Sequence, residues 1–178
     1  MTVFYTSDTH FCHGRILALA GRPFRDIRDH DETLIRRWNS VVGDGDDIYH
    51  LGDFCHATED EARVRGIFFR LAGRKRLIIG NHDVDGDGRL LPMLADLPWE
   101  EAPAEERAIL DNGHSVILSH YPPAAGRKIA DGSYFFYGHL HARLPMDGRS
   151  RDVGVDMPDV DFTPRTFTEL IAAMPGWG

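Results

Sequence analysis

The 178-residue sequence predicts a mixed α/β fold, in which two β-sheets pack together and helices lie outside them. Two observations carry this expectation. The first half alternates short apolar runs with helical patterns, whereas the second half pairs its apolar runs through a hairpin signal at Asn112-Gly113. Because no repeat, low-complexity segment or linker interrupts the chain, we expect a single domain over residues 1–178.

The first half begins with a predicted strand and then alternates helices with strands. The longest predicted helix carries apolar side chains at spacings of three and four residues, and all three helices stop at a glycine. The predicted strands cover residues 2–7, 48–51 and 77–79. The predicted helices cover residues 12–20, 31–42 and 58–71, and the third opens with the capping box Thr58-Glu59-Asp60-Glu61.

The second half is expected to form mainly strands. A short helix near residues 89–95 precedes the hairpin, whose arms cover residues 107–110 and 115–118. Further strands are expected at residues 134–137 and around Val153 and Val155, and the segment 149–157 fits either a strand beside the site or a sheet edge. A last helix is predicted after the capping sequence Thr166-Phe167-Thr168-Glu169.

Composition and charge narrow the class of protein. Apolar residues make up 42% of the chain and charged residues 27%, which is ordinary for a globular domain. The formal net charge of -8 argues against a protein that coats nucleic acid, which usually presents a basic face. The sequence opens on a strand pattern and contains no membrane-spanning run, so we expect a cytoplasmic protein in which Cys12 and Cys55 stay reduced.

Polar side chains follow five predicted strands at their carboxyl ends. The clearest case is the third, where an Ile-rich run meets Gly80, which we expect to let the backbone turn sharply. The five strand ends read Asp8-Thr9-His10, Gly52-Asp53, Gly80-Asn81-His82-Asp83, Ser119-His120 and Gly138-His139-Leu140-His141. One such end is ordinarily a capping residue or a histidine bonded to backbone. Recurrence at five strands instead indicates one shared site at the edge where open α/β sheets build them.

The chemistry of these side chains predicts metal binding. Carboxylates, neutral imidazoles and an amide oxygen suit Mn, Fe, Zn or Ni better than they suit a thiolate site. Asp8 and His10, like His139 and His141, alternate along backbone that we expect to be extended, which would direct each pair into one cleft. The ligands outnumber the needs of one ion, whereas two ions about 3.5–4 Å apart with a shared carboxylate would use them all.

The motifs DxH, GD, GNHD, a single histidine after a strand, and GHxH occur in this order between Asp8 and His141. Together they resemble the motifs of the calcineurin-like metallophosphoesterase superfamily. The resemblance implies a four-layer fold, with two mixed sheets flanked by helices. It also implies metal-dependent hydrolysis of a phosphate ester by two divalent ions, of which manganese is favoured.

The resemblance further implies a role for each motif residue. The implied metal ligands are Asp8, His10 and His141 for the first ion, Asn81, His120 and His139 for the second, and Asp53 as the bridge between them. His82 would be the catalytic histidine near the leaving group, with Asp83 as its orienting partner. Hydroxide formed on the paired cations near neutral pH would attack the phosphorus.

Three further residues are weaker candidates for substrate binding. His13 lies three residues after His10, His56 lies three residues after Asp53, and Arg127 lies on a segment that follows a ligand-bearing turn. Each fits a loop or helix-start position equally well or better. The two cysteines fit small buried residues better than metal ligands.

The motifs leave the substrate open. A small phosphodiester is the first choice, with nucleotides among the candidates, because nothing in the sequence resembles a dedicated monoester pocket. A phosphomonoesterase with the same site is the alternative. A non-catalytic metal-binding scaffold is a third, although such a chain should lack ligands or the catalytic histidine, and this one keeps them. Binding to extended nucleic acid is not expected from the acidic composition.

Overall fold

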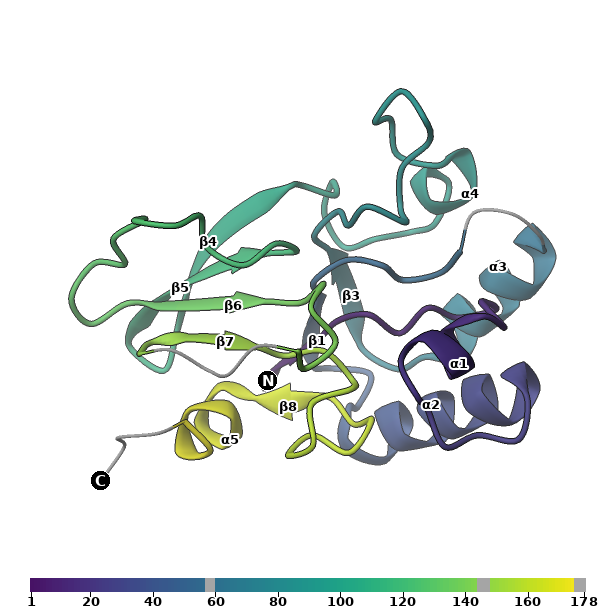
Figure 1. Ribbon diagram of the computed structural model, residues 1–178, viewed down its shortest axis with the longest axis horizontal. Coiled ribbons are helices and arrows are strands. Elements are labelled where there is room, and N and C mark those ends of the chain that lie inside the picture. Colours follow the sequence, from purple (N-terminus) through teal and green to yellow (C-terminus); the bar gives the residue numbers. More distant parts are fainter. Residues whose placement is uncertain (57–59, 144–147, 175–178) are drawn as a thin grey trace.

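The computed structural model describes residues 1–56, 60–143 and 148–174 (Figure 1). Two four-stranded mixed sheets pack together and helices lie outside them, which confirms the predicted fold class. Within these residues no helix is long and apolar enough to cross a membrane.

The first sheet has the strand order β3-β2-β1-β8. It consists of β1 (Val3–Thr6), β2 (Asp47–His50), β3 (Arg74–Leu77) and β8 (Arg165–Thr166). The first three strands are parallel and β8 is antiparallel to β1. Since parallel strands end at the same edge, the segments that follow β1, β2 and β3 emerge side by side.

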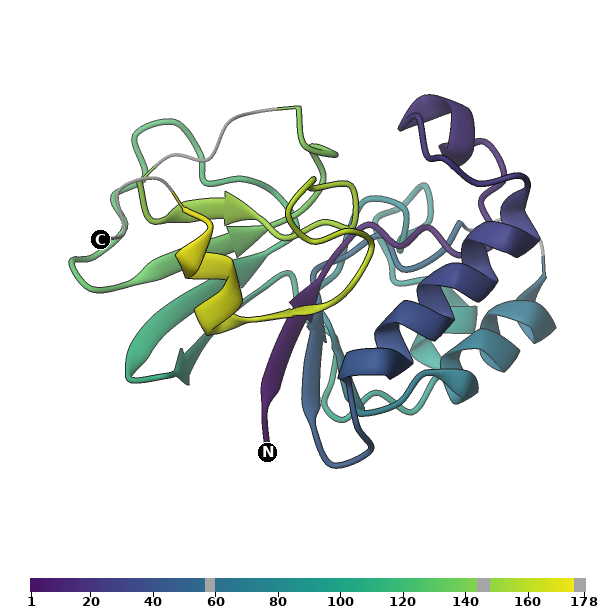
Figure 2. The same cartoon turned by 90° about the horizontal axis from the view of Figure 1, so that it is seen from below.

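Helices α1 (Ile16–Leu19), α2 (Ile27–Val41) and α3 (Glu61–Arg70) belong to the connections of this first sheet. Helix α4 (Pro92–Ala95) lies in the connection from β3 to the second sheet. Figure 2 shows α2 and α3 on the side of the sheet that faces away from the second sheet. Trp38 of α2 and Phe68 of α3 are buried there with Phe4 and Ile48 of the sheet. This apolar layer fixes the strands against the helices.

The second sheet has the order β4-β5-β6-β7. It consists of β4 (Glu106–Asp111), β5 (His114–Ser119), β6 (Tyr134–Tyr137) and β7 (Ser150–Asp152). The predicted hairpin is confirmed: Asn112 and Gly113 have φ values of 48° and 79°, as a type I′ turn requires. Helix α5 (Phe167–Ala172) follows with the predicted capping box, in which the side chains of Thr166 and Glu169 each accept a hydrogen bond from the backbone N–H of the other residue.

The second core lies between the two sheets. Tyr5 and Tyr49 from the first sheet pack with Leu118 and Phe136 from the second, and Phe167 of α5 closes the layer. The segment after β7 then joins the sheets, because Gly154 pairs with Ser7 directly after β1. Segment 149–157 thus forms a sheet edge and also runs beside the loop that begins at Asp8.

Several boundaries differ from the sequence-based expectation. Helix α2 begins at Ile27 rather than near Asp31, because the Asp26 side chain accepts hydrogen bonds from two backbone N–H groups of the first turn. The third strand comprises Arg74–Leu77, and Ile78 makes only an isolated bridge. The Thr58 and Glu59 positions of the predicted capping box lie outside the described residues, and Asp60 is the N-cap of α3.

Candidate metal centre

Five loops meet at one edge of the two sheets, and they are the loops that follow β1, β2, β3, β5 and β6. Backbone hydrogen bonds tie neighbouring loops together. The Asp8 N–H donates to the carbonyl of Gly52 (3.0 Å), and the Gly138 N–H donates to the carbonyl of His120 (3.0 Å). The residues expected at five strand ends are therefore held in one place.

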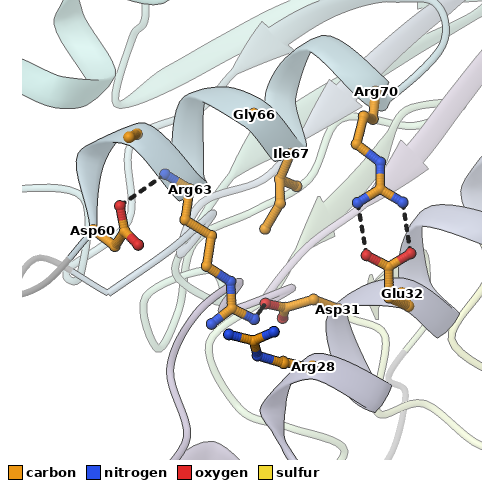
Figure 3. A pocket seen from close by; sticks show the side chains of 9 residues that line it. Arg28, Asp31, Glu32, Asp60, Arg63, Gly66, Ile67 and Arg70 are labelled. Carbon is orange, nitrogen blue, oxygen red and sulfur yellow. Dashed lines mark hydrogen bonds and ion pairs between the residues drawn. The ribbon is translucent and has the colours of Figure 1, made fainter.

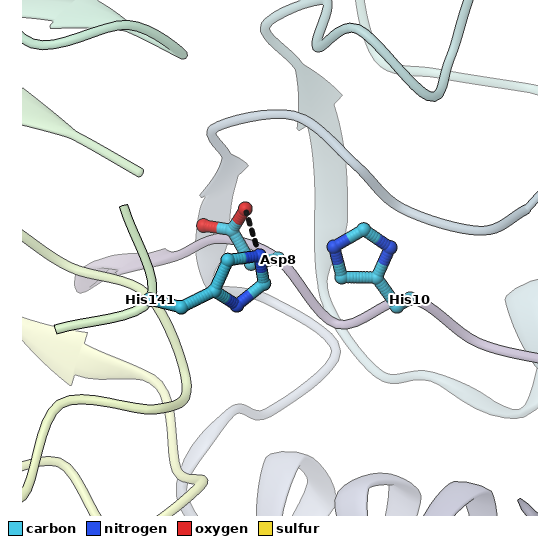
Figure 4. A group of neighbouring side chains, drawn as sticks. All are labelled: Asp8, His10 and His141. Atoms are coloured by element: carbon cyan, nitrogen blue, oxygen red, sulfur yellow. Dashed lines mark ion pairs between the residues drawn. The ribbon is translucent and has the colours of Figure 1, made fainter. Parts of the chain in front are cut away.

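A first group consists of Asp8, His10 and His141, shown in Figure 4. One ligand atom from each lies within 4.8 Å of the others. The His141 Nε2 is 3.9 Å from the Asp8 Oδ1. Asp8 and His10 are buried, so the group has a carboxylate and an imidazole shielded from solvent.

A second group surrounds the amide of Asn81. Its Oδ1 lies 3.0 Å from the His120 Nε2 and 2.9 Å from the His139 Nδ1. The other ring nitrogen of His120 is 2.8 Å from the carbonyl oxygen of Leu51, to which it donates. The Nε2 of His120 therefore faces the Asn81 oxygen, and these two atoms are types that can coordinate one cation together.

Asp53 lies between the two groups. Its Oδ2 is 3.6 Å from the His10 Nε2 and 3.5 Å from the His120 Nε2. It also forms one candidate ligand set with His120 and His139, and another with His10 and His82. A single buried carboxylate thus faces ligands of both groups.

The backbone of these loops is left-handed rather than extended. The residues concerned, with their φ values, are Asp8 (57°), His10 (48°), Asp53 (57°), His139 (72°) and His141 (48°). The expectation that DxH and GHxH alternate along extended backbone is therefore wrong, although their side chains do converge. A left-handed residue other than glycine costs about 1–2 kcal/mol, and such strain concentrates at functional sites.

Gly80 and Gly138 let the loops approach closely. A Cβ on Gly80 would lie 2.5 Å from the backbone nitrogen of Asp53, and one on Gly138 would collide with the side chains of Ser7 and Asp8. The φ of Gly80 is not left-handed. Its function is therefore this close approach, and not the sharp turn expected from the sequence.

Asp83 has different partners from those expected. Its carboxylate is fully buried and accepts hydrogen bonds from the backbone N–H groups of Asp53 (2.8 Å), Phe54 (2.9 Å) and Gly80 (2.8 Å). It therefore joins the loops after β2 and β3, instead of orienting the His82 ring. The His82 backbone N–H itself donates to Asp53 Oδ1 (2.8 Å).

The electrostatics of the cluster favour a bound cation. Burial, together with the carboxylates of Asp8 and Asp83, raises the pKa of Asp53 to about 8. Burial also lowers the pKa of His10, so its ring is neutral, and neither of its nitrogens has a hydrogen-bond partner among the described residues. Crowded buried carboxylates beside unpartnered neutral imidazoles are suited to divalent metal ions.

Two residues that sequence reasoning missed support His141. The Asp156 Oδ2 lies 2.6 Å from the His141 Nδ1. The same carboxylate accepts two hydrogen bonds from the buried Arg22 guanidinium, from Nε and from a terminal nitrogen, both at 2.8 Å. Carboxylates bonded to the second nitrogen of a metal-binding histidine fix its tautomer and orientation.

Arg22 also holds the backbone of the first loop. Its guanidinium donates to the carbonyl oxygens of Asp8 (2.6 Å) and Thr9 (3.0 Å) and lies 2.8 Å from the His30 Nε2. The buried Asp152 accepts a hydrogen bond from the N–H of Ala142, the residue after His141 (3.3 Å). Neither Arg22 nor Asp152 belongs to a motif, so no local signal distinguishes them.

Of the three weaker candidates for substrate binding, two lie near His82 and one does not. The rings of His13 and His56 stack with their centroids 4.1 Å apart, and each lies within 6 Å of the His82 ring (5.8 and 5.4 Å). Arg127 is not near them. It pairs with Glu106 through both terminal nitrogens (2.6 and 2.8 Å) and stacks over a ring of the second sheet.

The cluster opens into a cavity of about 370 Å³. A larger cavity of about 520 Å³ lies between α2 and α3 (Figure 3). There Arg63 pairs with Asp31 and Arg70 with Glu32, so these charges are already neutralised. The smaller cavity combines open space with the grouped imidazoles and carboxylates, whereas the larger one is lined by these paired charges.

Cys55 is buried in the first core, and Cys12 packs against that core. Burial raises the pKa of the Cys12 thiol to about 12. Among the described residues neither cysteine belongs to a candidate ligand group.

A sandwich of two mixed sheets with Asp, His and Asn side chains gathered on its edge loops defines a metallophosphoesterase. The family model for calcineurin-like phosphoesterases matches residues 1–157, and the chain belongs to this family of metal-dependent phosphoester hydrolases.

Relatives extend over nearly the whole chain. The uncharacterized protein MJ1445 of Methanocaldococcus jannaschii is 32% identical over 174 residues, which cover 95% of this chain and 89% of that protein. The gene 66 protein of Mycobacterium phage L5 is 30% identical over 178 residues, covering 86% of each. A solved structure, the protein of unknown function AQ665 from Aquifex aeolicus, shares the fold with a TM-score of 0.71 at 24% identity, over 96% of this chain and 98% of that chain.

Proposed function

We propose that the protein hydrolyses phosphate esters at a centre of two divalent cations, and that phosphodiesters are its preferred substrates. The observation that carries the proposal is the position of Asp53, whose Oδ2 lies 3.6 Å from the His10 ring and 3.5 Å from the His120 ring. A carboxylate that faces two sets of ligands is the group that two neighbouring cations would share.

The proposed ligands fall into two sets joined by Asp53. They are Asp8, His10 and His141 for one cation, and Asn81, His120 and His139 for the other. Cations held by these groups would lower the pKa of a bound water and offset the charge of the phosphate. A set of oxygen and imidazole ligands suits manganese, which we propose as the metal.

His82 is proposed to act at the leaving group. Its ring is half-buried, lies 5.0 Å from the His10 ring between centroids, and lines the same cavity. The hydrogen bond from its backbone N–H to Asp53 fixes it relative to the shared carboxylate. From there a ring nitrogen, when protonated, can deliver its proton to the departing oxygen, an effect of about 10²–10⁴-fold. His13 and His56, stacked beside it, suit contacts with the phosphate or the leaving group.

The test measures hydrolysis of bis(4-nitrophenyl) phosphate and 4-nitrophenyl phosphate by metal-stripped protein before and after addition of Mn²⁺. We expect cleavage only with metal and faster on the diester. The variant His82→Ala tests the role of the histidine. It should bind as much manganese as the unaltered protein, by elemental analysis, yet lose most of its turnover. Faster cleavage of the monoester would contradict the diester preference. No cleavage despite two bound ions would contradict hydrolysis and favour a scaffold.

A further inference from the structure

Two clefts meet at the metal centre. The helix-side cleft is lined by Leu19 of α1, His82 and Arg143, among others. The hairpin-side cleft is lined by Tyr121 and Glu105, among others, and lies between the β4–β5 hairpin and the loop after β3. Each has a volume of about 370 Å³, and Asn81 lines both. A phosphate bound at the centre would therefore have open space on two sides.

We propose that the hairpin-side cleft binds the non-leaving arm of a phosphodiester, and that this arm is an uncharged aromatic group with hydrogen-bond donors, as in a nucleoside. The leaving arm then lies in the helix-side cleft. This inference rests on the proposed function, which it deepens by assigning a side of the centre to each ester substituent.

Tyr121 supplies the aromatic surface. It follows His120 directly, and its ring centroid lies 5.0 Å from that of His120 and 4.9 Å from that of His139. These contacts hold the ring at the metal centre, yet the residue remains 49% exposed. An exposed aromatic face beside a phosphate site is suited to stacking with a planar group.

The charged side chains of each cleft determine which kind of substituent it can bind. Glu105 is exposed in the hairpin-side cleft, while the neighbouring Glu106 is paired with Arg127. Glu105 has no ion-pair partner in the part of the chain that the structure describes, and an unpaired carboxylate repels a second phosphate and accepts hydrogen bonds from hydroxyl or amino groups. The helix-side cleft carries Arg143 instead, so it tolerates an anionic arm. The two clefts therefore differ in the charge they accept.

The position of His82 indicates which of the two clefts receives the leaving arm of the diester. Its side chain lines the helix-side cleft, where the departing oxygen would receive its proton. On the same side, Leu19 is 58% exposed and offers an apolar surface to the leaving arm. The arm that stays on phosphorus is thus directed towards Tyr121.

The experiment compares two diesters that release the same 4-nitrophenolate. One is thymidine 5′-(4-nitrophenyl phosphate), whose non-leaving arm is a nucleoside, and the other is methyl 4-nitrophenyl phosphate. The kcat/KM of each is measured with manganese-loaded protein, and the ratio of the two values is compared among variants. The variants are Tyr121→Ala, Tyr121→Phe, and Phe69→Ala as a control at an exposed aromatic residue of α3.

We expect Tyr121→Ala to lower the nucleoside-to-methyl ratio about tenfold, the size of one lost stacking contact. Tyr121→Phe and Phe69→Ala should keep the ratio. An unchanged ratio in Tyr121→Ala would overturn this inference but not the proposed function. The same holds if both activities fall equally because the neighbouring ligands are disturbed. If the unaltered protein cleaves neither diester, the proposed function fails instead.

Discussion

At the scale of single residues, the orientation of the His141 ring depends on a buried ion pair whose two residues are not proposed ligands. Arg22 donates two hydrogen bonds to Asp156, and Asp156 in turn bonds the His141 Nδ1. Both charged side chains are largely shielded from solvent, at 0% and 8% exposure. The pair leaves the Nε2 of His141 free to face Asp8. We infer that the pair orients His141 for metal binding.

The substitution Asp156→Asn tests this positioning role. It keeps the size of the side chain but removes the charge that orients the imidazole, so we expect manganese affinity to fall about 10–100-fold. Calorimetric titration with Mn²⁺ measures the change without reference to activity. Asp159→Asn is the matched control, because Asp159 pairs with Arg151 and not with a proposed ligand. Equal affinities in the unaltered protein and the Asp156 variant would contradict the role.

The role of a single residue could be predicted from the sequence only where that residue belongs to a motif. The Asp, His and Asn residues at strand ends stand out because they recur in one pattern. Arg22 and Asp156 do not, since they are separated by 134 positions and neither neighbours a motif. Only the fold brings them together.

At the scale of elements, the loops after β1, β2 and β6 contain left-handed residues, and the loops after β2, β3 and β6 contain glycines at points of close approach. Asp8 and Asp53 both have a φ of 57°, and Gly80 packs against the backbone of Asp53. The Asp83 carboxylate bonds the N–H groups of both Asp53 and Gly80. The loops are thus fixed to each other as well as to their strands.

Gly80→Ala should disturb this contact. The added Cβ would lie 2.5 Å from the Asp53 nitrogen, and overpacking of this kind costs about 1–3 kcal/mol. We expect the free energy of unfolding, measured by urea denaturation, to fall by that amount. Gly86→Ala is the control in the same connection between β3 and α4, where an added Cβ meets nothing within 4 Å. Equal stability of the two variants would show that the loops separate easily.

The existence of most elements was predictable, whereas several boundaries were not. The Asn112-Gly113 turn and the Thr166–Glu169 capping box act locally, and both are confirmed. Helix α2 begins earlier because Asp26 caps it, a signal that apolar periodicity does not contain. The two-residue strand β8 exists through its pairing with β1, which is a long-range contact.

At the scale of the whole molecule, the sandwich brings loops from both sheets to one edge. The first sheet contributes Asp8, Asp53 and Asn81, and the second contributes His120 and His139. The sequence predicts that such ligands gather, but not the two clefts beside them. The two clefts depend on the distance of the hairpin and of α1 from the metal centre, and tertiary packing determines that distance.

We propose that Asp53 joins two cations, and the most direct test is electron paramagnetic resonance of the manganese-loaded protein, with elemental analysis of the same sample. We expect two manganese ions per chain with the spectrum of an exchange-coupled pair, and loss of the coupling in Asp53→Ala. One ion per chain, or two ions without coupling in the unaltered protein, would contradict the shared carboxylate.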